Sequence, residues 1–275
     1  MNKSVLVTGA GRGIGRAIAL RLAKEGYHVF CCARSREQLE ETRKLSEGRI
    51  EVEVVDVTDQ KACQRWIQTS CEKVTPWGLV TAAGTYGAIG PFVQNSWAEW
   101  TAGIEVNLMA PLFAAKTFSA ILLERKLTGR LIFLSGGGAT KPLPNLTNYC
   151  AAKAAIVRVA ETLALELQPF KITVNSLAPG AIATELTRKV LEAGPQAAGD
   201  EFYRQTKKQF DEGGQSPEHA ANLTAYLLSD KGAEITGKLI SAIWDPWETL
   251  HARKEITGSK DDLTLRRTVP ANFQR

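Results

Sequence analysis

Tyr149 and Lys153 are the residues of this 275-residue sequence whose types and spacing most directly suggest chemistry. They lie four positions apart in a stretch of helical character, so both side chains fall on one face of a helix. An ammonium group lowers the pKa of a nearby phenol, whose ordinary value is about 10, and such a phenol exchanges a proton near neutrality. Because one such pair arises easily by chance among five tyrosines, its meaning depends on the surrounding motifs.

A glycine-rich loop near the N-terminus is the second candidate site. The run Thr8 to Gly15 reads TGAGRGIG and follows a short β-rich apolar run, directly before a helical stretch. Glycines there allow a tight turn and a close approach of the backbone to a diphosphate at the start of the helix. The loop lacks the Lys-Ser/Thr ending of a P-loop, which argues against phosphate transfer. The residues we expect to bind a dinucleotide here are Gly9, Gly11, Arg12, Gly13, Ile14 and Gly15.

The end of the second apolar run favours NADP(H) over NAD(H). A carboxylate is expected there when a site binds a free ribose 2′-hydroxyl, but the chain reads Cys32-Ala33-Arg34-Ser35. Arg34, with Arg12 in the glycine loop, is suited to pair with a 2′-phosphate. Two solvated surface arginines are the alternative interpretation.

Seven short β-rich runs alternate with helix-length segments and predict the scaffold that positions these residues. Parallel strands connected by crossover helices predict an α/β protein with a doubly wound seven-stranded parallel sheet, helices on both faces and a single domain. We expect that domain to span residues 1–245, with a lid or substrate segment at about 182–215 and a C-terminal tail at 246–275. The expected strands are Ser4–Val7, His28–Cys32, Ile50–Val55, Leu79–Ala83, Arg130–Leu134, Lys171–Leu177 and Leu239–Trp244.

Composition excludes several classes of protein. The 34 basic and 29 acidic residues are interspersed, so we expect no nucleic-acid partner. No run of about 18 uninterrupted apolar residues is present, and the apolar start Val5–Val7 is too short for a signal-peptide core. We therefore expect a cytoplasmic protein with no membrane partner. The five cysteines form no CxxC pair and lack histidines at metal-ligand spacing, so we expect reduced thiols and no metal site.

The order of the motifs resembles that of the short-chain dehydrogenase/reductase family, classical type, from Ser4 to about Ile243. The matching elements are TGAGRGIG at Thr8 to Gly15, Asp56-Val57, the AAG of Ala82 to Gly84, Asn107, YCAAK at Tyr149 to Lys153, and PGAIAT at Pro179 to Thr184. The resemblance implies a Rossmann-like fold, an NAD(P) cofactor, a small-molecule carbonyl or alcohol substrate, and a homodimer or homotetramer.

Roles for individual residues follow from the resemblance. Tyr149 would be the general acid or base and Lys153 would assist it while holding the nicotinamide ribose. Asn107 would anchor a water in the proton relay. The remaining cofactor-binding residues would be Asp56 and Val57 at the adenine, Ala83 and Gly84 after the fourth strand, and Pro179, Gly180, Ile182 and Thr184 at the carboxamide end.

The sequence departs from the family pattern at the usual catalytic serine. That residue lies thirteen positions before the tyrosine, where this chain has Gly136, and Ser135 is one residue away. A one-residue shift along a strand reverses the direction of a side chain, so Ser135 could replace the serine only with a local bulge. The run Gly136–Gly138 indicates either backbone N–H donors in a widened pocket or a site that has lost its chemistry.

The interpretation that we adopt is an NADP(H)-dependent oxidoreductase that interconverts a carbonyl and a secondary alcohol, with Tyr149 as the acid or base and with Lys153, Asn107 and Ser135 as further catalytic candidates. The alternatives are an NAD-linked sugar or hydroxy-acid dehydrogenase, and a dinucleotide-binding protein with lost or reduced catalysis.

The helix at Tyr149–Leu167 is apolar on two flanks, which predicts packing against a second copy. Leu263, Leu265 and Val269 are suited to dock the tail on a neighbouring subunit, and a loose tail is the alternative. The substrate is not predicted by these motifs.

Overall fold

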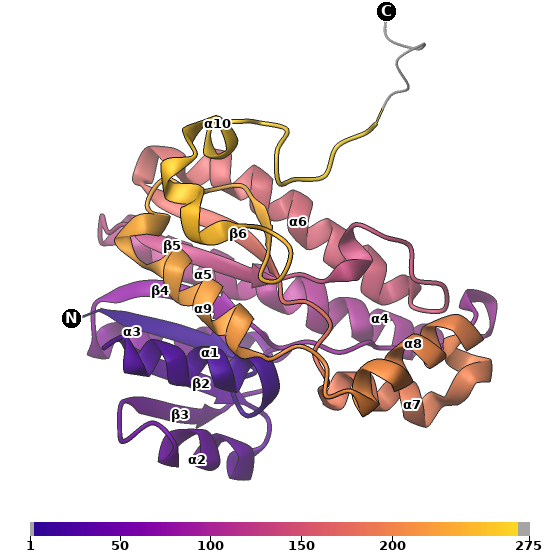
Figure 1. Cartoon of the computed structure of the whole chain (residues 1–275). Helices are drawn as coiled ribbons and strands as arrows, with labels where there is room; N and C mark the ends of the chain where they lie inside the picture. The colour runs from indigo at the N-terminus through magenta and orange to yellow at the C-terminus, as the bar shows by residue number, and fades with distance from the viewer. Residues whose placement is uncertain (1–2, 269–275) are drawn as a thin grey trace, which may run out of the picture.

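A seven-stranded parallel sheet forms the centre of the computed structural model, which describes residues 3–268 (Figure 1). The strand order is β3-β2-β1-β4-β5-β6-β7, and every neighbouring pair is parallel. This confirms the predicted doubly wound sheet. The strands are β1 (Ser4–Thr8), β2 (His28–Ala33), β3 (Ile50–Val54), β4 (Pro76–Thr81), β5 (Gly129–Leu134), β6 (Ile172–Ala178) and β7 (Leu239–Ser241).

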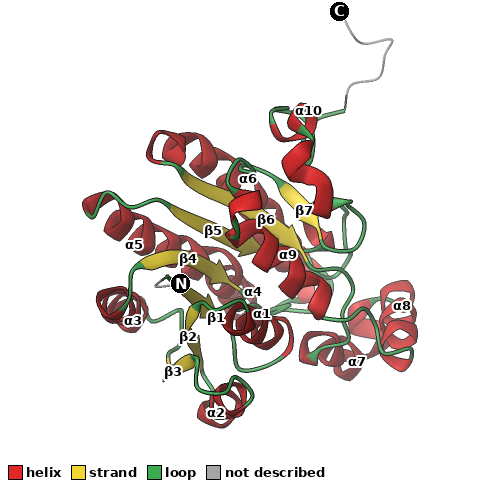
Figure 2. Ribbon diagram, turned by 60° about the vertical axis from the view of Figure 1, so that its left-hand side comes forward, coloured by secondary structure: helices red, strands yellow, loops and turns green. Residues whose placement is uncertain are grey.

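The central strands are nearly continuous apolar runs because helices cover both faces of the sheet. All residues of β1, β4 and β5 are buried. One core is shared with α1 (Gly13–Lys24), α2 (Arg36–Lys44) and α9 (Glu218–Leu228). The opposite core is shared with α3 (Gln60–Lys73), α5 (Ala110–Glu124) and α6 (Thr147–Leu167). Figure 2 shows these helices flanking the sheet.

Two strands end more than one residue before the predicted end, and at each a side chain binds the backbone. β4 starts at Pro76 and stops at Thr81, and beyond it the Ala83 N–H donates to the hydroxyl of Thr8. β7 stops at Ser241, where the backbone N–H donates to the Asp245 carboxylate and starts a turn. A hydrogen bond from the backbone to a side chain ends strand pairing at that point.

The helix α4 (Trp97–Ile104) runs through one π-helical turn, Glu105–Met109, into α5. The combined helical stretch Trp97–Glu124 is long enough and apolar enough to span a membrane. Core helices of soluble proteins also meet these criteria of length and composition. In the fold α5 packs against α3 and the strands β4 and β5. The absence of a membrane partner and the cytoplasmic location remain predictions.

Segment 182–215, expected to be a lid, forms a helical hairpin of α7 (Glu185–Ala198), which is kinked at Gly194, and α8 (Asp200–Asp211). A single antiparallel bridge between Ile182 and Gly214 closes the base of the hairpin. Figure 2 shows α7 and α8 outside the helices that flank the sheet. The two ends of segment 182–215 are thus held together by the bridge, while its helices project from the rest of the protein.

The C-terminal segment folds back onto its own chain after a 3-10 helix (Trp247–Ala252) and α10 (Lys254–Thr257). The Leu239 N–H at the edge of β7 donates to the Leu263 carbonyl oxygen, and Leu263 packs against the core. On α6, Glu161 accepts hydrogen bonds from Thr264 and Arg266. The described part of the tail is therefore docked within the chain, whereas Val269 lies outside the described residues. Residues 1–245 as a domain separate from this tail remain a prediction.

Candidate active site

Tyr149 and Lys153 lie on the buried side of α6, with the Lys153 Nζ 5.7 Å from the centre of the Tyr149 ring. Lys153 donates a hydrogen bond of 2.8 Å to the Leu134 carbonyl oxygen at the end of β5. This bond uses one of the three donors of the ammonium group. The last residue of β5 thus holds the lysine, and α6 places the phenol next to it.

Burial changes the proton chemistry of both groups. Burial raises the pKa of Tyr149 well above its ordinary value, with smaller contributions from Tyr86 and Cys150. Burial also lowers the pKa of Lys153 to about 8. The expectation that Lys153 lowers the pKa of the phenol is therefore wrong, because loss of solvation raises that pKa. Tyr149 is protonated near neutral pH.

Gly136 lies directly against the Tyr149 hydroxyl. A Cβ atom at position 136 would be 2.4 Å from the Tyr149 Oη, so the tip of the phenol fills the space that a side chain would take. The buried hydroxyl of Ser135 instead donates to the Lys153 carbonyl oxygen at 3.4 Å. The two positions therefore face different parts of α6, and a catalytic role for Ser135 remains a prediction.

Asn107 holds the chain after β4 through its side-chain amide. Its Oδ1 accepts from the Thr85 N–H at 3.2 Å, and its Nδ2 donates to the carbonyl oxygens of Thr85 and Gly103. A Cβ at Gly84 would lie 3.2 Å from the Asn107 Oδ1 and 3.9 Å from the Lys153 Nζ. Asn107, Gly84 and Lys153 are thus neighbours, and the amide of Asn107 fixes the loop between them.

Two glycines of the N-terminal loop allow contacts that no other residue permits. Gly9 has a φ of +67°, and a Cβ there would lie 2.6 Å from the Ala83 backbone. A Cβ at Gly15 would lie 2.3 Å from the Gly9 carbonyl oxygen. A left-handed backbone and close packing both favour glycine. The loop is therefore pressed against the end of β4.

The start of α1 fits a dinucleotide diphosphate. Arg12, the residue before the helix, makes no side-chain cap, and the first turn carries no acidic residue. The first N–H groups of the helix, from Gly13 to Gly15, thus lack a side-chain cap and are available to an anion. Thr184 lies beside this turn, 3.6 Å from a Cβ built on Gly13, and the Arg12 guanidinium is 3.8 Å from the Glu185 carboxylate.

Arg34 is exposed at the end of β2, near Asp56. Partial burial acts to raise the pKa of Asp56, but hydrogen bonds from Thr58 and the positive charge of Arg34 outweigh it, so the pKa is lowered. Ser35 caps α2 by accepting from the Gln38 N–H. The end of β2 thus carries a cation and no acid of its own.

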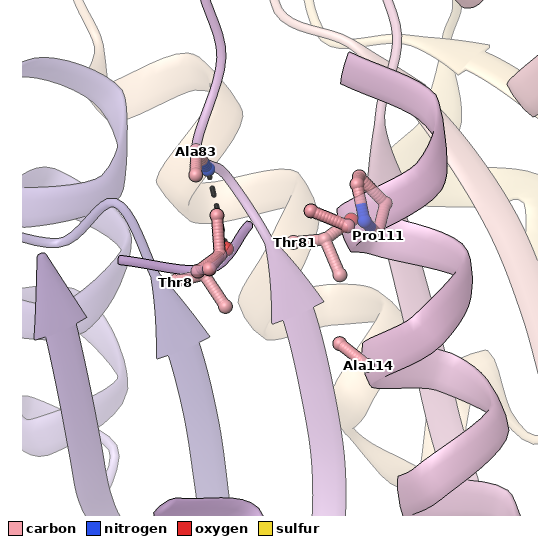
Figure 3. Close-up of a pocket in the computed structure, with 7 residues that line it drawn as sticks. Thr8, Thr81, Ala83, Pro111 and Ala114 are labelled. Atoms are coloured by element: carbon pink, nitrogen blue, oxygen red, sulfur yellow. Dashed lines mark hydrogen bonds between the residues drawn. The ribbon is translucent and has the colours of Figure 1, made fainter. Parts of the chain in front are cut away.

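A narrow crevice, without room for a water molecule, lies between the carboxyl ends of β1 and β4 and the start of α5 (Figure 3). Among its walls are Val57 and Ala83, two of the predicted cofactor-binding residues. β1 pairs with β2 on one side and with β4 on the other, so the strand order reverses here. Dinucleotides bind at this reversal point in doubly wound sheets.

The turn after β6 bears the remaining predicted residues. Gly180 has a φ of +88° and follows Pro179, and a Cβ at Gly180 would lie 2.5 Å from Ile243. Ile182 is buried and forms the bridge to Gly214. This turn therefore connects the sheet to the α7–α8 hairpin.

Three residues that organise the site are not among the predicted catalytic or cofactor-binding residues. Thr8 accepts a hydrogen bond from Ala83, and Asn148 donates to the Ala88 carbonyl oxygen. Tyr86 contacts the ring of Tyr149 edge-on, with 4.9 Å between ring centres. The sequence could have indicated the role of Asn148, since a polar residue in an apolar helix needs a hydrogen-bond partner when it is buried.

Residues 3–194 match the family model described as short chain dehydrogenase. The chain belongs to this family. Short-chain dehydrogenases are NAD(P)-dependent oxidoreductases, and this one acts on carbonyl and alcohol groups. A 3-oxoacyl-[acyl-carrier-protein] reductase of Staphylococcus aureus is 34% identical over 253 residues, which cover 87% of this chain and 96% of the relative.

Two solved structures resemble the fold and carry different cofactors. A variant of actinorhodin polyketide ketoreductase with NADPH is 29% identical, with a TM-score of 0.78 over 87% of this chain and 95% of the other. An NAD⁺-bound xylitol dehydrogenase is 25% identical, with a TM-score of 0.76 over 87% and 97%. Proteins similar to this chain thus include binders of either dinucleotide.

Proposed function

We propose that this short-chain dehydrogenase is an NADP(H)-dependent reductase that converts a small-molecule ketone into a secondary alcohol. The observation that carries the proposal is the buried phenol of Tyr149 beside the Lys153 ammonium, next to a glycine loop suited to a dinucleotide. The raised pKa keeps the Tyr149 phenol protonated at neutral pH. A protonated phenol is the form that a general acid needs for reduction.

The residues of the site fit the cofactor. The uncapped N–H groups of α1 would hold the diphosphate, and the free donors of Lys153 would hold the nicotinamide ribose. Asp56, Val57, Ala83 and Gly84 would surround the adenosine half, while Pro179, Gly180, Ile182 and Thr184 would hold the carboxamide end. The bound cofactor would supply a hydride.

Three side chains take part in the transfer of the proton to the substrate. Tyr149 donates it to the carbonyl oxygen of the substrate. Lys153 stabilises the phenolate that remains, because an ammonium ion favours a nearby anion. Asn107 keeps the loop after β4 in register and, as in the family, would anchor a water that returns the proton. Ser135, whose hydroxyl is bound to the α6 backbone, supports the position of Lys153.

The preference for NADP(H) rests on Arg34 and Arg12. Both guanidinium groups are exposed near the glycine loop, and β2 ends without the acid that would repel a phosphate. Asp56 and Glu185 each lie near one of the two arginines, which favours the second candidate, an NAD-linked dehydrogenase of sugars or hydroxy acids. A fluorescence titration with NADPH and NADH distinguishes the two, and equal affinity would contradict the role of Arg34.

A dinucleotide-binding protein with lost catalysis is the third candidate, and Gly136 favours it. We propose that Gly136 stands where the family has its catalytic serine, since this position faces the Tyr149 hydroxyl. Incubation with NADPH and a panel of simple ketones, 3-oxoacyl thioesters and keto-sugars tests for turnover. Oxidation of NADPH that depends on one of these ketones supports the reductase. Tight NADPH binding without turnover of any ketone supports the binding protein.

We further propose a homodimer or homotetramer that uses α6. One flank of this helix is buried in the core, but the other leaves Ala151 exposed and Ala155, Val159 and Leu163 half-buried. A second copy would cover that flank. Light scattering at micromolar protein concentration tests this, and a monomer would contradict it.

A further inference from the structure

Tyr86 contacts the Tyr149 ring and has no role in the function proposed above. The two rings meet edge to face at 72°, with 4.9 Å between their centres. Among residues 3–268, neither phenol hydroxyl forms a hydrogen bond with another side chain or with the backbone. Tyr149 is 8% exposed and Tyr86 is half-buried. The site therefore holds two adjacent phenols whose hydroxyls remain available to a ligand.

The loop that carries Tyr86 is fixed on both sides. Before it, both backbone groups of Thr85 bind the amide of Asn107. After it, the Ala88 carbonyl oxygen accepts a 2.8 Å hydrogen bond from the Asn148 Nδ2. Asn148 directly precedes Tyr149 in α6. The helix that positions the first phenol thus also positions the loop of the second.

Neither Gly136 nor Ser135 offers a free side-chain hydroxyl near the Tyr149 hydroxyl. Gly136 has no side chain, and the phenol tip takes the space of a Cβ at that position. Ser135 directs its hydroxyl to the α6 backbone. Of these three residues, Tyr86 is therefore the one that contacts Tyr149 and has an available side-chain hydroxyl.

We infer that Tyr86 donates a second hydrogen bond to the substrate carbonyl oxygen, which receives its proton from Tyr149. The inference rests on the proposed reductase function. In the reaction the carbonyl carbon gains a hydride from the reduced nicotinamide, the oxygen gains the Tyr149 proton, and Tyr86 keeps its own proton throughout. The bond from Tyr86 strengthens as negative charge develops on the oxygen, which lowers the barrier.

Two features suit Tyr86 to this task. Burial raises its pKa to about 12, so the hydroxyl remains a neutral donor at every ordinary working pH. The Phe202 ring of α8 meets the Tyr86 ring edge-on, with 6.4 Å between the ring centres. An apolar neighbour excludes water, and a hydrogen bond to a developing charge is stronger where water is excluded.

The test compares Tyr86→Phe, Tyr86→Leu and Tyr226→Phe, using the ketone of the panel that the wild-type chain reduces fastest. Tyr226 is the control because its hydroxyl binds His251 at the surface of α9. We expect Tyr86→Phe to lower kcat about 10²-fold, with KM changed less than about threefold, because the lost bond forms mainly in the transition state. NADPH affinity, measured by fluorescence, stays the same, and Tyr226→Phe keeps the wild-type kcat.

The outcomes separate this inference from the proposed function. If Tyr86→Phe retains the wild-type kcat while Tyr86→Leu loses it, the ring acts only by packing and the inference is overturned. If Tyr86→Phe raises KM alone, the bond forms equally in the ground state, which also overturns it. A wild-type chain that binds NADPH but reduces no ketone of the panel contradicts the proposed function itself, and the inference with it.

Discussion

At the scale of residues, burial determines the protonation states of Tyr149 and Lys153. The same loss of solvation raises the pKa of Tyr149 and lowers that of Lys153 to about 8. The spacing of the pair in the sequence correctly predicts that they are neighbours on α6. It does not predict the direction of the phenol's pKa, because desolvation depends on every element that packs around the site.

The lowered pKa of Lys153 predicts how reduction depends on pH. Below about pH 8 the lysine is an ammonium ion and supports Tyr149, and above that pH the fraction of charged lysine falls. We expect kcat/KM for ketone reduction to be constant at lower pH and to fall about tenfold per pH unit above about 8. A pH–rate profile from pH 6 to about 10 measures this, and a rate that rises through pH 8 would contradict it.

Arg34 determines cofactor preference if it binds the 2′-phosphate. Replacing Arg34 by alanine removes a charge-assisted contact of about 1.5–3 kcal/mol, so we expect NADPH affinity to fall about 10–150-fold with NADH affinity nearly unchanged. Arg36→Ala is the matched control, since Arg36 is an exposed cation two residues away. Fluorescence titration of both dinucleotides measures the effect. An equal loss for NADPH in the Arg36 variant would assign the preference to overall charge.

At the scale of elements, the ends of the strands create the site. The glycine loop after β1 packs on the end of β4, and the turn after β6 reaches the glycine loop at Thr184. Alternation of apolar runs with helical stretches predicts this sheet because parallel strands are buried on both faces. The early ends of β4 and β7 were not predictable, since they depend on contacts of Ala83 with Thr8 and of Ser241 with Asp245.

Glycine at position 9 is required by the fold independently of any ligand. We expect Gly9→Ala to lower the free energy of unfolding by at least about 2 kcal/mol, because the added Cβ overlaps the Ala83 backbone at a positive φ. Gly137→Ala is the control, since a Cβ there meets nothing within 4 Å. Urea denaturation of both variants measures the difference. Similar stabilities would show that the loop does not pack against β4 as described.

At the scale of the whole molecule, the tail completes the edge of the sheet. Lys238, in the approach to β7, is buried, and its ammonium donates to the carbonyl oxygens of Ser259 and Asp262. The sequence suggested docking on a neighbouring subunit from three apolar residues. It could not distinguish that from docking within the chain, because the acceptors that hold the tail are mostly backbone atoms and the Glu161 carboxylate.

Removing residues 259–275 should destabilise the protein through Lys238. The truncation leaves a buried ammonium without its two acceptors, and we expect a loss of at least about 2 kcal/mol in the free energy of unfolding. The further change Lys238→Met in the truncated chain should restore part of that loss. Denaturant unfolding of the three proteins measures this. A truncated chain as stable as the full chain would show that these contacts contribute little.

The central claim is that this chain reduces a ketone with a proton from Tyr149. Its most direct test uses NADPH deuterated at the transferred position of the nicotinamide, the panel of ketones, and mass spectrometry of the alcohols, for wild type and Tyr149→Phe. The account predicts deuterium on the carbinol carbon with the wild-type chain. It predicts a rate about 10²–10⁴-fold lower for Tyr149→Phe, at unchanged NADPH affinity. NADPH binding without labelled alcohol from the wild type, or equal rates for the two proteins, would contradict it.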